Sequence, residues 1–396
     1  MERMAGTIAI GLRTPIIKEG DDIEEIVVST ILKASEVEGF SIDDKDIISV
    51  TESIVARAQG NYVSVDHISK DITSKFGKET IGVIFPILSR NRFSICLRGI
   101  AKGVKKIILM LQYPSDEVGN PLISLDELDK KGINPWTDTL TEKEFRRLFG
   151  YKKHPFTGID YINYYKSIIE AHGTECQIIF SNDPKTILNY TKDVLACDIH
   201  SRFRTKIILK ANGANKIYSL DDILTKSIDG SGYNETYGLL GSNKTTEEKV
   251  KLFPRDCQPI VDKIQNMIKD KTEKTVEVMI YGDGAFRDPV GNIWELADPI
   301  VSPAYTKGLE GTPNEIKLKY LADNTFANLK GEELNKAIYE YIKHKNSNPV
   351  DPMERQGTTP RRLTDLIGSL ADLISGSGDK GTPVVYIKGY FNNYVE

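Results

Sequence analysis

A strand-like run that passes directly into a helical pattern, close to the start of the chain, is the feature that most constrains the fold. Residues 46–50 are β-rich and bounded by turn residues, which is typical of a buried strand. The following residues, 51–59, carry a helical pattern that stops at Gly60. Helix and strand alternate again near the C-terminus, where a helical pattern over 363–374 precedes a strand-like run over 383–387. These alternations predict a mixed α/β or α+β fold.

The remaining elements of this fold follow from the same two periodicities. A strand is expected over 5–10, and Gly20-Asp21-Asp22 is expected to supply the N-cap of a helix that runs to about residue 34. The pattern also predicts a set of further elements: helices over 68–75, 79–101, 258–270 and 331–344, a strand over 276–281, and a polar loop over 298–315.

The middle of the chain differs in texture from its two ends. Strands are predicted over 105–111 and 177–181, with helical pieces at 141–149 and 160–171 between them, and this alternation indicates an α/β unit. A length of 396 residues also exceeds one typical domain. We therefore expect a core formed by residues 1–101 and 231–396, with residues 102–230 as an inserted α/β subdomain of unknown role.

Composition excludes several classes of function. A formal net charge of −4 provides no field that would recruit nucleic acid or an anionic membrane. No stretch approaches the roughly 18 apolar residues of a membrane span, and no signal-peptide pattern is present, so a cytoplasmic location is expected. Four widely spaced cysteines without a CxxC pair are predicted to be reduced and mostly buried thiols; they are Cys96, Cys176, Cys197 and Cys257.

The glycine-rich loop Ser375-Gly-Ser-Gly-Asp-Lys-Gly381 joins a predicted helix to a predicted strand. Small residues allow backbone N–H groups to converge on an anion, and Lys380 adds a positive charge. The order helix, loop, strand differs from that of a Walker A loop. On pattern alone, a phosphate cradle and a flexible connector are equally compatible with this sequence.

Two other turns carry groups that could serve phosphate chemistry. Asp283, between two glycines at the end of a predicted strand, could hold Mg²⁺ bound to phosphate, and Arg287 could meet a phosphate; a tight turn is the alternative. The Gly241-Ser-Asn-Lys244 turn offers hydroxyl, amide and ammonium groups, although these residues also form ordinary turns. The five histidines occur singly, which gives no support to a nucleophilic triad.

Five blocks of sequence, taken in order, resemble the family of coenzyme F420-0 γ-glutamyl ligases. The opening Thr14-Pro-Ile-Ile17 with Lys18-Glu-Gly-Asp-Asp22 is similar to the family's first turn, and Thr51–Gly60 to its strand-following Lys-Ala-Glu-Gly run. Three later blocks complete the resemblance: Tyr237–Asn243, Ile280–Phe286, and the final helix with its loop and strand over 365–385. The preserved order is more specific than any single block. The resemblance does not cover the middle insert.

The resemblance implies a GTP-dependent (or ATP-dependent) amide ligase that uses Mg²⁺ or Mn²⁺ and acts as a homodimer. An acceptor carboxylate would be phosphorylated, and the amine of L-glutamate would displace phosphate from the acyl phosphate. The acceptor would be coenzyme F420-0, with a folate-type acceptor as an alternative. Asp283 would be a metal ligand and, with Arg287, catalytic. The nucleotide would contact a larger set: Thr14, Pro15, Ile16, Ile17, Glu52, Ser53, Arg57, Asn243, Ser375, Gly376, Ser377, Gly378, Asp379, Lys380, Gly381 and Thr382.

Three positions depart from the family pattern. Leu240 stands where the family has a metal-binding aspartate, Gly284 where it has a threonine, and Ser377 where it has a glutamine ligand. A leucine side chain cannot ligate a cation. These departures leave open a second function, that of a non-catalytic nucleotide-binding or regulatory protein that kept the fold.

Overall fold

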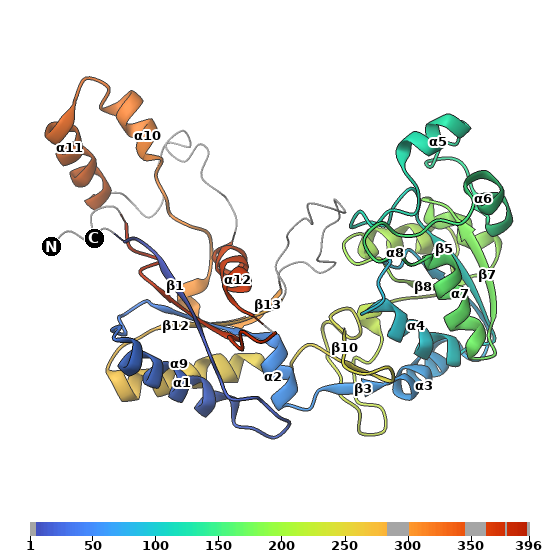
Figure 1. The fold of residues 1–396 in the computed structure, drawn as a ribbon, viewed down its shortest axis with the longest axis horizontal. Coiled ribbons are helices and arrows are strands. Elements are labelled where there is room, and N and C mark those ends of the chain that lie inside the picture. The colour runs from blue at the N-terminus through green and yellow to red at the C-terminus, as the bar shows by residue number, and fades with distance from the viewer. Residues whose placement is uncertain (1–4, 283–300, 345–361, 377, 394–396) are drawn as a thin grey trace.

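The computed structural model describes residues 5–282, 301–344, 362–376 and 378–393. Two lobes, each built on its own sheet, lie on either side of a small three-stranded sheet (Figure 1). We call the lobe with the five-stranded sheet the first lobe and the lobe with the six-stranded sheet the second lobe. Each combines a sheet with covering helices, so the mixed α/β or α+β fold predicted from the sequence is confirmed.

The first lobe joins both ends of the chain in one sheet. Its strands lie in the order β1-β14-β2-β12-β13, and β2 and β12 are its parallel pair. The pairs β1 with β14, β14 with β2, and β12 with β13 are antiparallel. The strands are β1 (Ile8–Leu12), β2 (Ile47–Thr51), β12 (Glu277–Gly282), β13 (Val301–Tyr305) and β14 (Val384–Lys388).

Helices cover both faces of this sheet because its strands carry apolar side chains on each face. On β14, Val384 and Tyr386 join the apolar cluster under α1 (Ile23–Glu38) and α9 (Cys257–Thr272). The alternate residues of β14 join the cluster under α12 (Leu363–Ile374). This period-two alternation is that of a strand buried on both faces. The segment Gly20-Asp21-Asp22 supplies the N-cap of α1 as predicted, and the structure identifies Asp22, whose side chain accepts from the Glu25 N–H at 3.0 Å.

The second lobe holds a mostly parallel sheet in the order β6-β7-β5-β4-β8-β9, in which only β6 is antiparallel to its neighbour. Helices α3 (Val65–Phe76), α4 (Phe93–Lys102) and α7 (Tyr161–Ala171) contribute to the larger apolar cluster on it, and α8 (Arg202–Ala211) to the smaller one. The strands are β4 (Thr80–Ile84), β5 (Lys106–Leu111), β6 (Leu140–Thr141), β7 (Glu175–Phe180), β8 (Asp193–Ala196) and β9 (Lys216–Ser219).

The three-stranded sheet between the lobes has the order β10-β11-β3. Val63 and Val250 bring it into the main apolar cluster of the second lobe. Its strands are β3 (Tyr62–Ser64), β10 (Asn243–Lys244) and β11 (Lys249–Lys251). The other elements are α2 (Glu52–Ala58), α5 (Leu125–Lys131), α6 (Glu142–Phe149), α10 (Leu318–Tyr320), α11 (Gly331–Lys343), and the short turns of helix η1 (Pro184–Asn189), η2 (Leu220–Asp222), η3 (Lys307–Leu309) and η4 (Leu321–Thr325).

The helix predicted over 79–101 is wrong in its first half. Residues Thr80–Ile84 form β4, a central strand, and only Phe93–Lys102 are helical. Ile81 and Val83 face one apolar cluster and Ile84 the other. A short apolar run buried on both faces satisfies helical and strand periodicity equally, so periodicity could not decide between them.

The polar loop predicted over 298–315 also contains a strand, β13, which pairs with β12. Its Pro303 is compatible with this position because β13 is the last strand of the sheet. Proline has no N–H to donate, so in a central strand, which is paired on both sides, it would leave a hydrogen bond of the sheet unmade.

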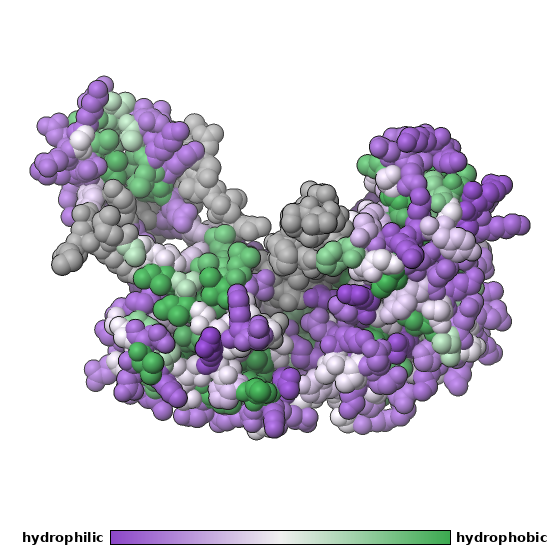
Figure 2. Space-filling view, viewed as in Figure 1, coloured by the Kyte–Doolittle hydropathy of each residue, from purple (hydrophilic) through white to green (hydrophobic). Residues whose placement is uncertain are grey.

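The six-stranded sheet extends on both sides of residue 102, since β4 precedes that residue and pairs with β5 and β8. The division into a core and an insert at residues 102–230 stays a prediction. The visible surface of the second lobe is mostly hydrophilic, whereas apolar residues gather on the first lobe over α12 (Figure 2). Within the described ranges, no helix has the length and apolar character required to cross a membrane.

Candidate functional site

A pocket of about 550 Å³ forms where segments from distant parts of the sequence meet. Its walls come from the segment after β1, the start of α2, the strands β10 and β11, and the loop between α12 and β14. The lining residues are Thr14, Pro15, Ile16, Ile17, Thr51, Glu52, Ser53, Ile54, Arg57, Asn243, Lys244, Lys251, Asp372, Ser375, Gly376, Gly378, Gly381 and Pro383.

Most of the residues predicted to contact a nucleotide are therefore brought together. Asp379, Lys380 and Thr382 belong to the same loop but do not line the pocket. Ser377, Asp283 and Arg287 lie outside the described residues. The assignment of these residues to nucleotide binding stays a prediction. The structure adds to the predicted nucleotide contacts the lining residues Thr51, Ile54, Lys251, Asp372 and Pro383, together with Lys244, which the sequence offered only as part of a candidate turn.

The first wall of the pocket is held to the glycine-rich loop by a backbone hydrogen bond. The Thr14 N–H donates to the Gly381 carbonyl at 3.3 Å. Ile17 is buried at 3%, whereas Ile16 is 82% exposed at the rim. One isoleucine thus fixes the segment to the core and the other leaves an apolar surface available to a ligand.

The floor of the pocket is the junction of β2 and α2. The Thr51 N–H donates to the Pro383 carbonyl at 3.1 Å, which ties this junction to the strand that follows the glycine-rich loop. Thr51 is the N-cap of α2, and its hydroxyl accepts from the Ser53 N–H at 3.5 Å. Arg57 is exposed in the last turn of the helix, so it can offer its guanidinium to an anion.

The glycine-rich loop is a closed turn. The Thr382 N–H donates to the Gly376 carbonyl at 3.1 Å, and the Gly376 N–H donates back at 3.4 Å. A Cβ added to Gly376 would lie 2.6 Å from side-chain carbons of Lys380, whereas one added to Gly378 would meet nothing within 4 Å. Gly376 is therefore required by close packing inside the loop, and Gly378 is not.

A buried ion pair crosses from the first lobe to the three-stranded sheet. Lys251 Nζ lies 3.0 and 2.9 Å from the Oε1 and Oε2 atoms of Glu52. The side chains are 10% and 4% exposed, and both residues line the pocket. The signal available in the sequence was weak, namely a lysine that directly precedes the buried pair Leu252 and Phe253.

Asn243 and Lys244 form the short strand β10 at the opposite wall. The Lys244 N–H donates to the Asn91 carbonyl at 3.0 Å, and its ammonium pairs with Glu247. In the preceding residue, the Ser242 hydroxyl lies 3.3 Å from the Cys96 thiol. These contacts fix the turn that the sequence identified as a weak candidate.

A single aromatic ring sets the spacing between this turn and the end of β12. A Cβ on Gly241 would lie 1.5 Å from the Phe253 ring, and one on Gly282 would lie 2.6 Å from the same ring. Phe253 is 3% exposed. Both glycines are therefore close-approach positions, where any side chain would overlap the ring.

The metal ion implied by the family resemblance does not find its ligands among the described side chains. Leu240 packs against the main apolar cluster of the second lobe and lines a small apolar cavity with Ile87, Cys96 and Leu239. In residues 5–282, 301–344, 362–376 and 378–393, no group of three or more histidine, cysteine, aspartate or glutamate side chains could hold a metal ion. The described residues therefore do not fit a metal at the Leu240 position.

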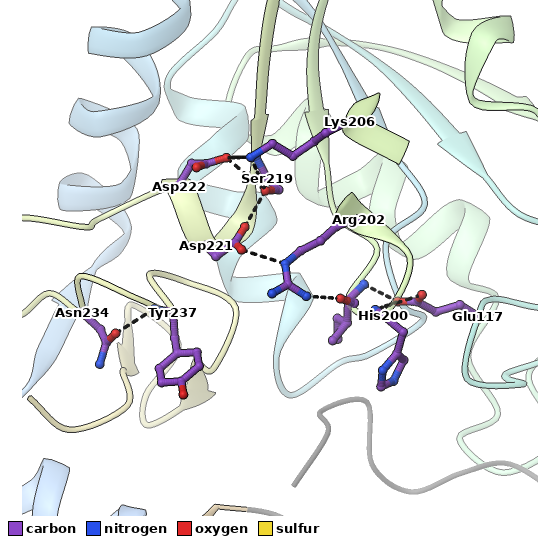
Figure 3. A network of polar contacts seen from close by, with 10 residues as sticks. Glu117, His200, Arg202, Lys206, Ser219, Asp221, Asp222, Asn234 and Tyr237 are labelled. Carbon is purple, nitrogen blue, oxygen red and sulfur yellow. Dashed lines mark hydrogen bonds and ion pairs between the residues drawn. The ribbon is translucent and has the colours of Figure 1, made fainter. Parts of the chain in front are cut away.

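The carboxyl edge of the six-stranded sheet carries polar groups whose hydrogen-bond partners lie in the same lobe (Figure 3). The Glu117 carboxylate accepts from the backbone N–H groups of His200 and Ser201, at 3.2 and 3.3 Å. Asp198 is fully buried and accepts from the Thr205 hydroxyl at 2.6 Å, while its Oδ1 atom has no partner within the described part of the chain. Burial raises the pKa of Asp198 to about 6. These contacts hold the connection between β8 and α8.

The same edge anchors the segment that leads to Leu240 and Asn243. Arg202 Nε lies 2.7 Å from Asp221, and the Asn234 side chain accepts from the Tyr237 N–H at 2.8 Å (Figure 3). The Leu239 N–H donates to the Leu220 carbonyl at 2.9 Å. The second lobe thus fixes the segment that leads into β10, a strand of the three-stranded sheet that lines the pocket.

Another pocket, of about 520 Å³, lies beside α10 and the segment after β14. Its lining includes Leu318, Ile342, Tyr390 and Phe391, and none of the residues predicted to contact a nucleotide or a metal. The candidate site is therefore the pocket between the lobes.

Comparison with known proteins gives one family. The family described as F420-0:Gamma-glutamyl ligase matches this chain over residues 11–389. That span includes the middle residues 102–230, for which the sequence blocks gave no family resemblance. No curated protein matches the chain.

Proposed function

The chain belongs to the F420-0:gamma-glutamyl ligase family, and on that premise we propose that it is a GTP-dependent amide ligase that adds L-glutamate to coenzyme F420-0. The family supports the ligase class and the acceptor. The use of GTP and of an acyl phosphate is our proposal for the pocket between the lobes.

In the proposed reaction the acceptor carboxylate attacks the γ-phosphorus of GTP, the bond to the β-phosphate oxygen breaks, and GDP leaves. The amine of L-glutamate then attacks the carbonyl carbon of the acyl phosphate. The carbon–oxygen bond to phosphate breaks, the amine loses a proton, and an amide and inorganic phosphate result. Both steps depend on stabilising negative charge on phosphoryl oxygens rather than on a protein nucleophile.

The observation that carries this proposal is the assembly of cations and small residues around one pocket. Arg57, Lys244 and Lys251 come from different elements and all line it. Gly376, Gly378 and Gly381 allow the loop backbone to approach a ligand closely. Such a wall of cations and glycines suits the polyphosphate of a nucleotide.

A direct test combines the purified protein with GTP, L-glutamate, Mg²⁺ or Mn²⁺, and coenzyme F420-0. Mass spectrometry should show the acceptor with one added glutamate, together with GDP. Parallel reactions with ATP and with a folate-type acceptor decide which nucleotide and which acceptor are used. Release of GDP without glutamate addition to either acceptor would contradict the ligase proposal and favour a non-synthetic nucleotide-binding role.

A matched pair of variants connects the activity to this pocket. Arg57→Met should raise the KM for GTP by about tenfold, since a hydrogen bond to a charged group contributes roughly 1.5–3 kcal/mol. Arg204→Met removes another exposed arginine, from α8, which does not line the pocket, and should leave the KM unchanged. Equal KM values for the two variants would place the nucleotide elsewhere.

A further inference from the structure

Leu240 stands where the family resemblance implies a metal-binding carboxylate, yet it lines the small apolar cavity and not the candidate pocket. A carboxylate at this position would draw a divalent cation toward the phosphates, but the leucine side chain lies in apolar contact with the second lobe. Nearby described residues do not supply a replacement set of metal ligands. A polyphosphate bound in the pocket would then depend on cations that the protein itself supplies there.

Lys251 is one such cation. In the antiparallel pair of β10 and β11, Lys251 is the partner of Asn243, which is three residues after Leu240. Its ammonium lines the pocket and is held by both carboxylate oxygens of Glu52. The strand pairing and the ion pair therefore fix a cation in the wall that β10 and β11 contribute to the pocket.

Burial of this ion pair carries a desolvation cost. Removing an ammonium and a carboxylate from water costs several kcal/mol per ion, and apolar residues of similar volume often stabilise a fold as well or better. The side chains here are only 10% and 4% exposed. A requirement for a fixed positive charge in the pocket accounts for keeping the pair.

We propose that Lys251 is a built-in cation that replaces one metal ion at the phosphates of the bound nucleotide. The proposal rests on the proposed function, because it assigns the charge partner of a nucleotide in the same pocket. An ammonium offers up to three N–H donors, so Lys251 can contact a phosphoryl oxygen while it remains paired with Glu52. Metal ions elsewhere in the pocket are compatible with this role.

The test measures GTP binding by calorimetry, with Mg²⁺ and with EDTA, for the full chain and for two lysine variants. Lys251→Met removes the proposed cation. Lys249→Met is the matched control, because Lys249 lies on the same strand but is exposed and does not line the pocket. In EDTA, Lys251→Met should weaken binding by at least about tenfold, while Lys249→Met should match the unmodified protein.

Comparing the Kd for GTP in EDTA and in Mg²⁺ distinguishes a residue that replaces a metal ion from one that only contacts the nucleotide. Loss of the built-in cation should make binding depend more on metal, so the ratio of Kd in EDTA to Kd in Mg²⁺ should be larger for Lys251→Met than for the unmodified protein. An equal ratio in the two proteins would overturn the proposal even if the variant binds more weakly. Lys251→Arg keeps the charge, and it should retain metal-free binding within about threefold.

Failure of the proposed function gives a different result. If the unmodified protein binds no GTP with or without Mg²⁺, both the nucleotide site and the role of Lys251 are wrong. If the unmodified protein binds GTP, and Lys251→Met binds it in EDTA with the same Kd as the control Lys249→Met, the nucleotide site stands and the role of Lys251 is wrong. Circular dichroism of each variant identifies loss of folding, in which case Lys251→Arg alone decides: weak metal-free binding by that folded variant overturns the proposal.

Discussion

Lys251 Nζ lies within 3.0 Å of both carboxylate oxygens of Glu52, although 199 positions separate the two residues in the chain. Glu52 belongs to α2 in the first lobe, and Lys251 to β11 beside the second lobe. The pair therefore connects the lobes at the point where the pocket is formed.

Removal of one partner of this pair should destabilise the protein. Glu52→Gln should lower the free energy of unfolding by roughly 3 kcal/mol, because it leaves a buried ammonium without its counter-charge. The Glu52→Met and Lys251→Met double variant should lie closer to the unmodified protein than either single variant. Urea denaturation followed by circular dichroism provides the measurement.

A surface pair serves as the reference for that experiment. Lys263 and Glu24 lie 3.3 Å apart, with the lysine side chain 52% exposed. Lys263→Met should change the free energy of unfolding by less than about 1 kcal/mol. Similar losses for Lys263→Met and Glu52→Gln would show that the interlobe pair behaves as an ordinary surface contact.

The glycine-rich loop offers a comparison between two glycines. Gly376→Ala places a Cβ 2.6 Å from the Lys380 side chain and should disturb the turn closed by Gly376 and Thr382. If holding the loop in its binding conformation costs the variant about 1–2 kcal/mol more, its affinity for GTP should fall about tenfold. Gly378→Ala meets open space and should bind GTP as the unmodified protein does. Identical affinities for both variants would argue against a packed phosphate loop.

Asp198 should make stability depend on pH. Burial raises its pKa from 3.8 to about 6, so the folded state binds a proton more readily than the unfolded state does. The contribution of Asp198 is therefore most favourable below the unfolded pKa and is lost as the pH rises through about 6. Asp198→Asn removes this titration.

The measurement compares the two proteins by urea denaturation across that window. Relative to the unmodified protein, Asp198→Asn should gain up to about 3 kcal/mol in unfolding free energy between about pH 4 and pH 7. Parallel pH profiles for the two proteins would show that the buried carboxyl does not titrate differently in the folded state.

The thiols should react slowly in the folded protein. All four cysteines are free, and three of them are buried. Burial raises the pKa of Cys96 to about 11 and the pKa values of Cys176 and Cys257 to about 12. Little reactive thiolate is then present near neutral pH. Titration with a thiol reagent should be slow in the native protein and should count four thiols after denaturation; rapid reaction of the native protein would contradict the burial of these groups.

Local patterns in the sequence were enough to predict much of the first lobe. The cap at Asp22, the passage from β2 into α2, and the helix before the glycine-rich loop depend on residues close in the chain. The phosphate-loop hypothesis for Ser375–Gly381 also used local composition, and it stays a prediction. Short-range rules of capping and periodicity are sufficient for such elements.

The features that were missed depend on distant contacts. The helix expected at β4 is wrong because the burial of this strand on both faces comes from helices on each side of the sheet. The partnership of Lys251 with Glu52 requires the register of β10 with β11 and the approach of the two lobes. Neither is encoded in a local pattern, so sequence reasoning from one chain could not supply them.

Phe253 has a consequence for how relatives of this chain can diverge. Its ring fills the space that a side chain at Gly241 or Gly282 would need. Loss of the ring would relax the constraint on both glycines at once, and a side chain at either position would require a smaller residue at position 253. These three positions should therefore change together in evolution, and an ancestral replacement at 253 should precede any exchange of either glycine.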